Sequence, residues 1–188
     1  VAHRLLEAAM ANALVTGAEH LPAHLVAEMR SNHAGETGAV WIYKGILAVS
    51  RDEEVRIFAE HHLATEQQHL AFFDQWLSGR QKSLLIPLWR LAGFILGVIA
   101  ALGGRSWVYA SIEAVETFVV SHYESQYDAV ERFGDTELLA TIQRFCNDEA
   151  NHRDEAAGDV ILPSRWLKAW CRLVSFGSEQ AVGVARKL

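Results

Sequence analysis

Four long segments of the chain place apolar residues three and four positions apart, the spacing that gives an α-helix one apolar face. A glutamate stands in the middle of each apolar stripe, and in two stripes a histidine follows it three residues later. The stripes are Leu25, Met29, Asn32, Glu36, Ala39, Tyr43 and Leu47; Val55, Phe58, His62, Glu66, His69, Phe73 and Trp76; Tyr109, Ile112, Glu116, Val119, Tyr123 and Val130; and Leu138, Ile142, Phe145, Glu149, His152, Ala156 and Val160. This pattern predicts four helices that pack into a bundle and bury charged groups near its middle.

Helix-breaking residues are scarce between these segments. The three prolines, Pro22, Pro87 and Pro163, fall where helices should begin or break, and no long stretch alternates with period two. We therefore expect an all-α fold, and 188 residues suit one domain over 1–188 with its four-helix core at about 22–160. The expected helices cover residues 22–50, 52–77, 106–133, 135–160 and 164–186, with a further helix before Gly17.

A strongly apolar segment, Ser83 to Gly104, lies between the second and third long helices. Its charge-free core, Leu91 to Leu102, has twelve residues, too few for a bilayer that needs about 20. The segment is either a buried crossover helix or an interfacial helix that touches lipid or admits an apolar substrate. Arg90, Trp89 and Trp107 flank the apolar core as amphipathic anchors do, which favours the membrane surface.

Composition excludes several classes of protein. A hydrophobic content of 51% rules out a disordered chain, and a net charge of −6 argues against a nucleic-acid partner. Cys146 and Cys171 are the only cysteines and lack the spacing of a structural zinc site, so a reducing compartment is expected. No apolar signal-peptide core follows Val1, so we expect that a targeting segment is either missing or already removed.

The buried glutamates require a partner. An ionised carboxylate in a core costs several kcal/mol, and the four stripes contain no lysine or arginine to offset four of them. Two divalent cations would balance four carboxylates, and two neutral imidazoles would complete the ligand set. One glutamate from each of two helices and Glu-x-x-His from each of two others is the ligand pattern of carboxylate di-metal bundles. The predicted ligands are Glu36, Glu66, His69, Glu116, Glu149 and His152.

Some assignments stay open from periodicity alone. Glu113 lies three residues before Glu116 on a similar face, and the spacing does not choose between them. Tyr43 and Tyr123 lie seven residues beyond Glu36 and Glu116, where they are candidate hydrogen-bond donors to the ligands. The remaining histidines near the stripes are more simply explained as packing residues; these are His33, His62 and His122.

At these residues the chain resembles the demethoxyubiquinone hydroxylases, or Clk-1 family, the di-iron monooxygenases of ubiquinone biosynthesis. The resemblance covers about residues 25–160 and begins with Asn-His-Ala-Gly-Glu-Thr-Gly-Ala at 32–39 and Ile-Tyr-Lys-Gly at 42–45. It continues through Glu-Gln-Gln-His at 66–69, Pro-Leu-Trp at 87–89 with Gly93-Phe94 and Leu96-Gly97, Ala-Val-Glu at 114–116 with His122-Tyr123, and Asp-Glu-Ala-Asn-His at 148–152. The resemblance selects Glu116 over Glu113 and adds His122 to the candidate supporting residues. Ser31-Asn32, Thr117 and the C-terminal end depart from the family pattern, which bears on substrate detail more than on metal binding.

This resemblance implies a ferritin-like bundle that binds two iron ions per chain. It implies that O₂ and two external electrons, from NADH or a quinol, hydroxylate the ring of a demethoxyubiquinone-type precursor. Because such an isoprenoid quinone is membrane-bound, we expect a peripheral protein that meets the membrane through about Leu84 to Leu102. The location would be the cytoplasmic face of a bacterial inner membrane, or the mitochondrial inner membrane if a transit peptide was removed, with a homodimer or a lipid-presenting helper protein as a further expected partner.

Other functions are compatible with a di-metal bundle. A ferritin-like iron-storage protein has no need of the apolar crossover, and a rubrerythrin-like peroxide-reducing enzyme would carry a Cys-x-x-Cys module that this chain lacks. A purely structural bundle is the third alternative. The ligand set itself accepts manganese as well as iron.

Overall fold

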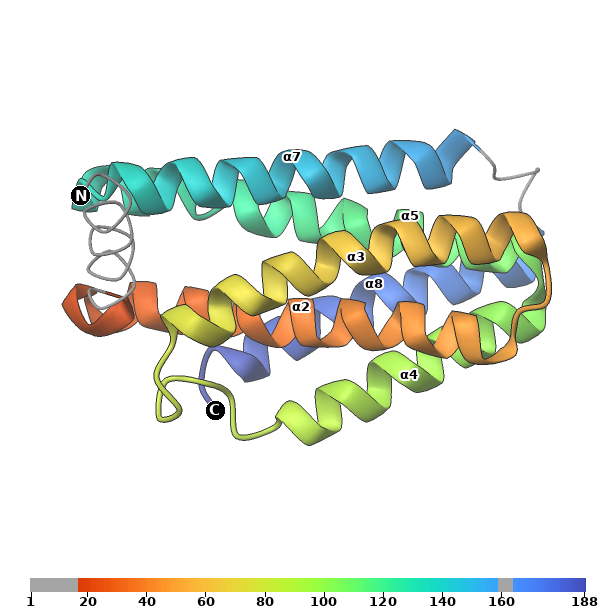
Figure 1. Cartoon of the computed structure of the whole chain (residues 1–188), viewed down its shortest axis with the longest axis horizontal. Coiled ribbons are helices and arrows are strands. Elements are labelled where there is room, and N and C mark those ends of the chain that lie inside the picture. The colour runs from red at the N-terminus through yellow and green to blue at the C-terminus, as the bar shows by residue number, and fades with distance from the viewer. Residues whose placement is uncertain (1–16, 159–163) are drawn as a thin grey trace, which may run out of the picture.

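The structure is a computed structural model that describes residues 17–158 and 164–188, and within these ranges the chain is helical without any strand. Four long helices form a bundle (Figure 1): α2 (Ala23–Val49), α3 (Glu53–Trp76), α5 (Arg105–Glu124) and α7 (Thr136–Gly158). The remaining elements are η1 (Ala18–His20), α4 (Ile86–Gly103), α6 (Tyr127–Phe133) and α8 (Arg165–Ala185). The predicted all-α bundle with a crossover helix and a C-terminal helix is confirmed. The helix expected before Gly17 and the end of the one expected over 135–160 fall outside the described residues.

Side-chain caps start several helices where the sequence predicted them. Asp52 accepts hydrogen bonds from the backbone N–H groups of Glu54 and Val55 at the start of α3. Asp135 accepts one from Leu138 at the start of α7, and Ser164 begins α8 in the same way. These caps satisfy donors that a helix leaves free in its first turn.

The prediction of one helix over residues 106–133 is wrong, because the chain turns at Ser125 and Gln126. The backbone N–H of Gln126 bonds the carbonyl of Tyr123, three residues back, and the Ser125 hydroxyl bonds the carbonyl of His122. These local bonds tighten and end the last turn of α5. The Gln126 side chain is buried and exchanges two hydrogen bonds with Asn32 of α2, at 2.8 and 2.9 Å, which fixes the turn against the bundle.

The core of the bundle has two apolar parts. One is built around buried residues such as Leu25, Met29 and Phe73, and the other around buried residues such as Ile46, Val55 and Ile112. The charged positions of the four stripes fall between them along the helices. The polar groups therefore lie at the middle of the bundle, with apolar packing on both sides.

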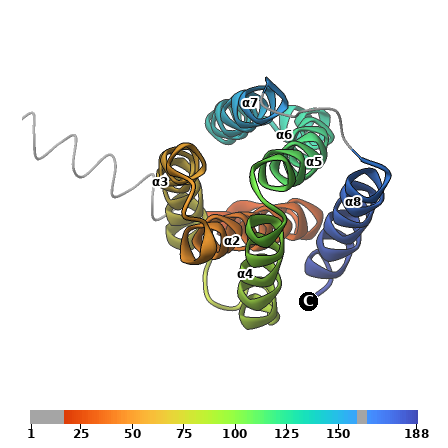
Figure 2. The same cartoon turned by 90° about the vertical axis from the view of Figure 1, so that its right-hand side faces the viewer.

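Helix α4 packs closely on α2. A Cβ added to Gly93 would collide with the backbone of Gly38, and one added to Gly97 would collide with the carbonyl of Ile42. Glycine at these two positions lets the helix backbones approach each other. Viewed along the bundle (Figure 2), α4 and α8 lie on the side of α2 and α5 that faces away from α3 and α7.

The outer faces of α4 and α8 are apolar and exposed. Among the helices of the described residues, α4 alone is long and apolar enough to cross a membrane by length and composition, yet only 17% of it is buried in the protein. The reading of this segment as a buried core helix is therefore wrong. Its exposed side chains include Leu84, Leu88, Leu91, Ile95 and Leu102, and those of α8 include Trp166, Leu173 and Phe176.

Candidate metal centre

The structure brings all six predicted ligand residues together inside the bundle. Helices α2 and α5 each contribute one glutamate, and α3 and α7 each contribute a glutamate and a histidine one turn apart. None of the six is more than 4% exposed: Glu36, Glu66, His69, Glu116, Glu149 and His152. Periodicity left Glu113 open as an alternative to Glu116, and Glu113 lies outside the cluster, so the geometry favours Glu116 as the predicted ligand.

The six side chains form two overlapping groups, each suited to one ion. Ligand atoms of Glu36, Glu66, His69 and Glu149 lie within 4.8 Å of one another. The ligand atoms of a second group also lie within 4.8 Å of one another; its members are Glu66, Glu116, Glu149 and His152. The two groups share Glu66 and Glu149. If two ions were bound, each group would supply one histidine and one glutamate of its own, and Glu66 and Glu149 would serve both.

Both histidines turn Nδ1 toward the carboxylates. His69 Nδ1 lies 2.8 Å from Glu149 Oε1 and 3.6 Å from Glu36 Oε2. His152 Nδ1 lies 3.1 Å from Glu66 Oε1 and 3.1 Å from Glu149 Oε2. The outer nitrogen of His69, Nε2, is hydrogen bonded to Asp148 Oδ2 at 3.1 Å. Asp148 was not among the predicted site residues, although it directly precedes the predicted ligand Glu149. A carboxylate that is hydrogen bonded to the outer nitrogen of a metal-binding histidine fixes the orientation of the ring.

The electrostatics of the cluster reflect too many carboxylates in a small buried volume. Burial and the neighbouring carboxylates raise the pKa of Glu66 and of Glu116 well above the ordinary value. Burial would also raise the pKa of Glu149, but hydrogen bonds with His152 and His69 outweigh it and lower this pKa to about 2. Burial would lower the pKa of His69, yet hydrogen bonds with Glu149 and Glu36 raise it to about 11. Glu66, Glu116 and His69 therefore bind protons more readily than usual, and bound cations would supply the same positive charge in place of these protons.

The donor set fits a pair of divalent cations. Among the described residues, neither carboxylate oxygen of Glu66 nor Oε1 of Glu116 has a hydrogen-bond partner. Leaving such buried oxygens without a partner is costly, and coordination to a cation would satisfy them. Carboxylate oxygens with imidazole nitrogens suit iron or manganese. That these residues bind metal remains a prediction.

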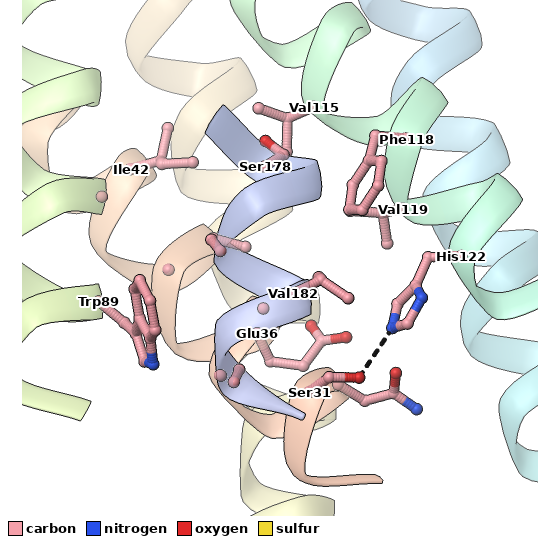
Figure 3. Close-up of a pocket in the computed structure, with 18 of the residues that line it drawn as sticks. Ser31, Glu36, Ile42, Trp89, Val115, Phe118, Val119, His122, Ser178 and Val182 are labelled. Carbon is pink, nitrogen blue, oxygen red and sulfur yellow. Dashed lines mark hydrogen bonds between the residues drawn. The ribbon is translucent and has the colours of Figure 1, made fainter. Parts of the chain in front are cut away.

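The three candidate supporting residues occupy different places. The Tyr123 hydroxyl donates a hydrogen bond to Glu36 Oε1, so this tyrosine orients a predicted ligand. Tyr43 is fully buried and stacks on His62 with 5.9 Å between ring centroids, while its hydroxyl has no hydrogen-bond partner among the described residues. His122 is not part of the carboxylate cluster, and its Nε2 lies 3.0 Å from the Ser31 hydroxyl (Figure 3).

Polar groups surround both ring nitrogens of His122. Its Nε2 lies 3.0 Å from the Ser31 hydroxyl and 3.2 Å from Gln126 Nε2, and its Nδ1 lies 3.4 Å from the Arg186 guanidinium. Ser31 in turn donates to the carbonyl of Glu28 at 2.7 Å. Burial, with the Arg186 charge, lowers the pKa of His122 to about 4, so this histidine is neutral at physiological pH.

A cavity of about 300 Å³ connects the cluster to the side of the bundle covered by α4 and α8. Carboxylates of the cluster, including Glu36 and Glu116, form part of its wall. Figure 3 shows Glu36 pointing into the cavity between Trp89 on α4 and His122 on α5. The remaining wall is mostly small or apolar: Ala34, Gly35, Gly38, Ala39, Ile42, Ala92, Gly93, Leu96, Val115, Phe118, Val119, Val174, Gly177, Ala181, Val182 and Ala185. An apolar molecule in this cavity could therefore reach the carboxylate cluster.

Comparison with known proteins places this architecture in a family. The family model described as "Ubiquinone biosynthesis protein COQ7" matches residues 23–185. The 3-demethoxyubiquinol 3-hydroxylase of Rhodospirillum rubrum is 44% identical over 166 residues, which cover 85% of this chain and 76% of the relative. Two further relatives are named "NADPH-dependent 3-demethoxyubiquinone 3-hydroxylase, mitochondrial", and each is 32% identical. The match to the protein of Dictyostelium discoideum covers 85% of this chain and 76% of the relative. The match to the protein of Rattus norvegicus covers 81% of this chain and 76% of the relative. The chain therefore belongs to the ubiquinone biosynthesis protein COQ7 family.

Proposed function

We propose that this protein is a di-iron, O₂-dependent monooxygenase that hydroxylates the ring of a demethoxyubiquinone-type precursor in ubiquinone biosynthesis. The observation that carries the proposal is the opening of the buried Glu/His cluster onto an apolar cavity, in a chain of this family. The relatives are named for hydroxylation at position 3 of demethoxyubiquinol or demethoxyubiquinone, and we assign the same ring position here.

The six clustered residues would hold the metal ions. His69 and Glu36 would bind one ion and His152 and Glu116 the other, with Glu66 and Glu149 shared between them. When bound, the iron pair supplies the redox chemistry that activates O₂ for insertion of one oxygen atom into a ring C–H bond. The second oxygen atom leaves as water, which requires two electrons and two protons from an external donor.

The residues of the cavity position the substrate and exclude water. Its apolar wall suits an aromatic ring and the start of an isoprenoid tail. At its polar end, Ser31 and His122 offer groups for the oxygen substituents of the ring. The Tyr123 hydroxyl holds Glu36 in place on the same wall, so the carboxylate keeps its orientation when a substrate enters.

The exposed apolar faces of α4 and α8 support a position on the membrane surface. Leu102 of α4 is 73% exposed and Trp166 of α8 is 68% exposed, far more than large apolar side chains that only pack inside a protein. Helix α4 packs along α2 through Gly93 and Gly97 and exposes its other face, so it would lie along the membrane surface with that face toward the lipid. Two helices that line the cavity would thus face the lipid in which an isoprenoid quinone resides. The location we propose is the cytoplasmic face of a bacterial inner membrane or the corresponding mitochondrial membrane.

The electron donor is proposed to be NADH, NADPH or a quinol. The eukaryotic relatives are named NADPH-dependent, and the bacterial one is named for a quinol substrate. A homodimer and a lipid-presenting helper protein remain predictions.

Iron storage is less well supported than hydroxylation. A storage protein has no use for an apolar cavity that ends at the ligands, nor for two exposed apolar helix faces.

The test of the proposed reaction is the origin of the inserted oxygen atom. Iron-loaded protein is incubated with a short-tailed demethoxyubiquinol and reductant under ¹⁸O₂, and the product mass is measured. We expect a product that is heavier by one ¹⁸O atom. Label derived from water, or an unchanged substrate alongside rapid peroxide consumption, would reject the monooxygenase.

A further inference from the structure

A third buried histidine, His62, lies beside the carboxylate cluster. His62 of α3 is 1% exposed, and neither of its ring nitrogens has a hydrogen-bond partner among the described residues. Its Nε2 lies 3.1 Å from Glu155 Oε2 of α7, close but without the geometry of a hydrogen bond. A buried imidazole without hydrogen bonds is costly, so the arrangement calls for a ligand that both groups could share.

His62 and Glu155 continue the ligand pattern by one helical turn. His62 lies four residues before Glu66 on α3, and Glu155 lies three residues after His152 on α7. Helices α3 and α7 run in opposite directions (Figure 1), and Glu66 faces His152 across them at 3.1 Å. The next facing pair along the two helices is therefore His62 with Glu155. The His62 ring also packs edge-on against the His152 ring, with 4.1 Å between centroids.

Glu155, His62 and His152 lie in a row from solvent to the cluster. The Glu155 side chain is 51% exposed, the His62 side chain is 1% exposed, and His152 belongs to the predicted ligands. At the other predicted histidine ligand, His69, the outer ring nitrogen is already hydrogen bonded to Asp148. The His62 end thus offers the cluster a nitrogen without a hydrogen-bond partner among the described residues, next to a half-exposed carboxylate.

The donor atoms of this pair suit a cation. The ionisable groups that face His62 are His152, His61, Glu149 and Glu155. Neither ring nitrogen of His62 has a hydrogen-bond partner among the described residues, so a nitrogen lone pair is open to a metal ion. A half-exposed carboxylate beside it attracts a hydrated divalent ion and provides the first oxygen ligand.

We propose that His62 and Glu155 form a loading site that takes a ferrous ion from solvent and passes it to the His152 side of the metal centre. The proposal rests on the proposed di-metal function. Glu155 captures the ion at the surface, His62 replaces part of its hydration shell, and His152 with Glu66 then receives it. The pair would act during assembly of the centre and not in the hydroxylation step.

The test is the rate at which metal-free protein takes up iron. Full-length apoprotein is mixed anaerobically with two equivalents of Fe²⁺, and unbound iron is trapped with a chromogenic chelator at timed intervals. Glu155→Gln keeps the shape of a half-exposed side chain and removes its charge. We expect this variant to load about tenfold more slowly, within the range that local charge gives to association rates, and to reach the same final iron content.

Asp154→Asn is the matched control, because it removes the same charge from the same turn of α7 at a side chain that is 69% exposed and pairs with Arg153. His62→Leu, of similar volume but without ring nitrogens, should load slowly like Glu155→Gln. Equal loading rates in the wild type, Glu155→Gln and Asp154→Asn would overturn the loading site while the metal centre stands. A wild-type protein that takes up no stoichiometric iron would instead refute the proposed metal centre itself.

Discussion

His69 Nδ1 of α3 lies 2.8 Å from Glu149 Oε1 of α7, so the two Glu-x-x-His motifs face each other across the bundle. The reverse contact, His152 Nδ1 to Glu66 Oε1, measures 3.1 Å. The carboxylates of Glu36 and Glu116 close the cluster from α2 and α5. Because Glu66 and Glu149 belong to both ligand groups, we expect the loss of either carboxylate to affect both metal positions.

The pair Glu116 and Glu113 provides a direct test of the ligand assignment. Glu116→Ala should lower bound iron from two ions per chain to one or none, because it removes a ligand that faces His152 and Glu149. Glu113→Ala, one turn away and outside the cluster, should leave the iron content unchanged. Metal quantitation after anaerobic loading, with circular dichroism to verify helicity, distinguishes them. Equal iron content in both variants would contradict the assignment.

The close contact of α4 with α2 predicts a large effect of one methyl group. In Gly97→Ala the new Cβ would overlap the carbonyl oxygen of Ile42, so α4 must shift, at a cost of about 3 kcal/mol. Gly183→Ala in α8 meets no atom within 4 Å and should instead stabilise the protein by roughly 0.5–1 kcal/mol through its helix propensity. Urea unfolding of both variants measures the difference. A Gly97→Ala variant as stable as the wild type would show that α4 is not packed as described.

Stability should fall in acid partly through His122. Its pKa is about 4 in the folded protein and 6.5 in the unfolded chain, so between these values the unfolded chain binds a proton that the folded one excludes. The contribution is fully present above pH 6.5 and is lost as the pH falls toward 4, by at most about 3 kcal/mol. Urea unfolding of the metal-free wild type and of His122→Gln, each at pH 7.5 and 4.5, isolates this effect. The wild type should lose more stability than the variant, whereas equal losses would contradict a buried neutral histidine.

The exposed face of α4 should bind lipid. Leu91 and Ile95 are 56% and 47% exposed on this face, and replacing both with glutamate should weaken liposome binding at least tenfold, because about 1.5 kcal/mol or more is lost for each side chain that enters the lipid. Ile57→Glu alters a side chain that is 63% exposed on α3 and serves as the control. Co-sedimentation with liposomes gives the comparison. Binding that survives the double substitution, or that Ile57→Glu abolishes equally, would place the membrane contact elsewhere.

The periodicity of the sequence predicted the bundle and its cluster because both depend on which residues share a helix face. Glu36, Glu66 and Glu149 interrupt apolar stripes, and that interruption is visible without coordinates. The choice between Glu116 and Glu113 could not be made without coordinates, because both residues lie near the same helix face. Only the packing of α5 against the other helices separates them.

Contacts between distant segments were beyond prediction from periodicity. The break between α5 and α6 depends on the amide pair of Asn32 and Gln126, residues that lie 94 positions apart. The hydrogen bond from Tyr123 to Glu36 and that between His69 and Asp148 likewise join different helices. The facing of His62 and Glu155 could have been inferred, because each lies one turn beyond a predicted ligand on helices expected to face each other.

The central claim, that six buried side chains hold two iron ions for hydroxylation, is tested most directly by a single-turnover experiment. Apoprotein is loaded anaerobically with Fe²⁺, the bound iron is counted, and one exposure to O₂ follows in the presence of a short-tailed demethoxyubiquinol and reductant. We predict two irons per chain and a product heavier than the substrate by one oxygen atom. Iron that fails to bind in stoichiometric amount, or a product formed equally well by the metal-free protein, would contradict the account.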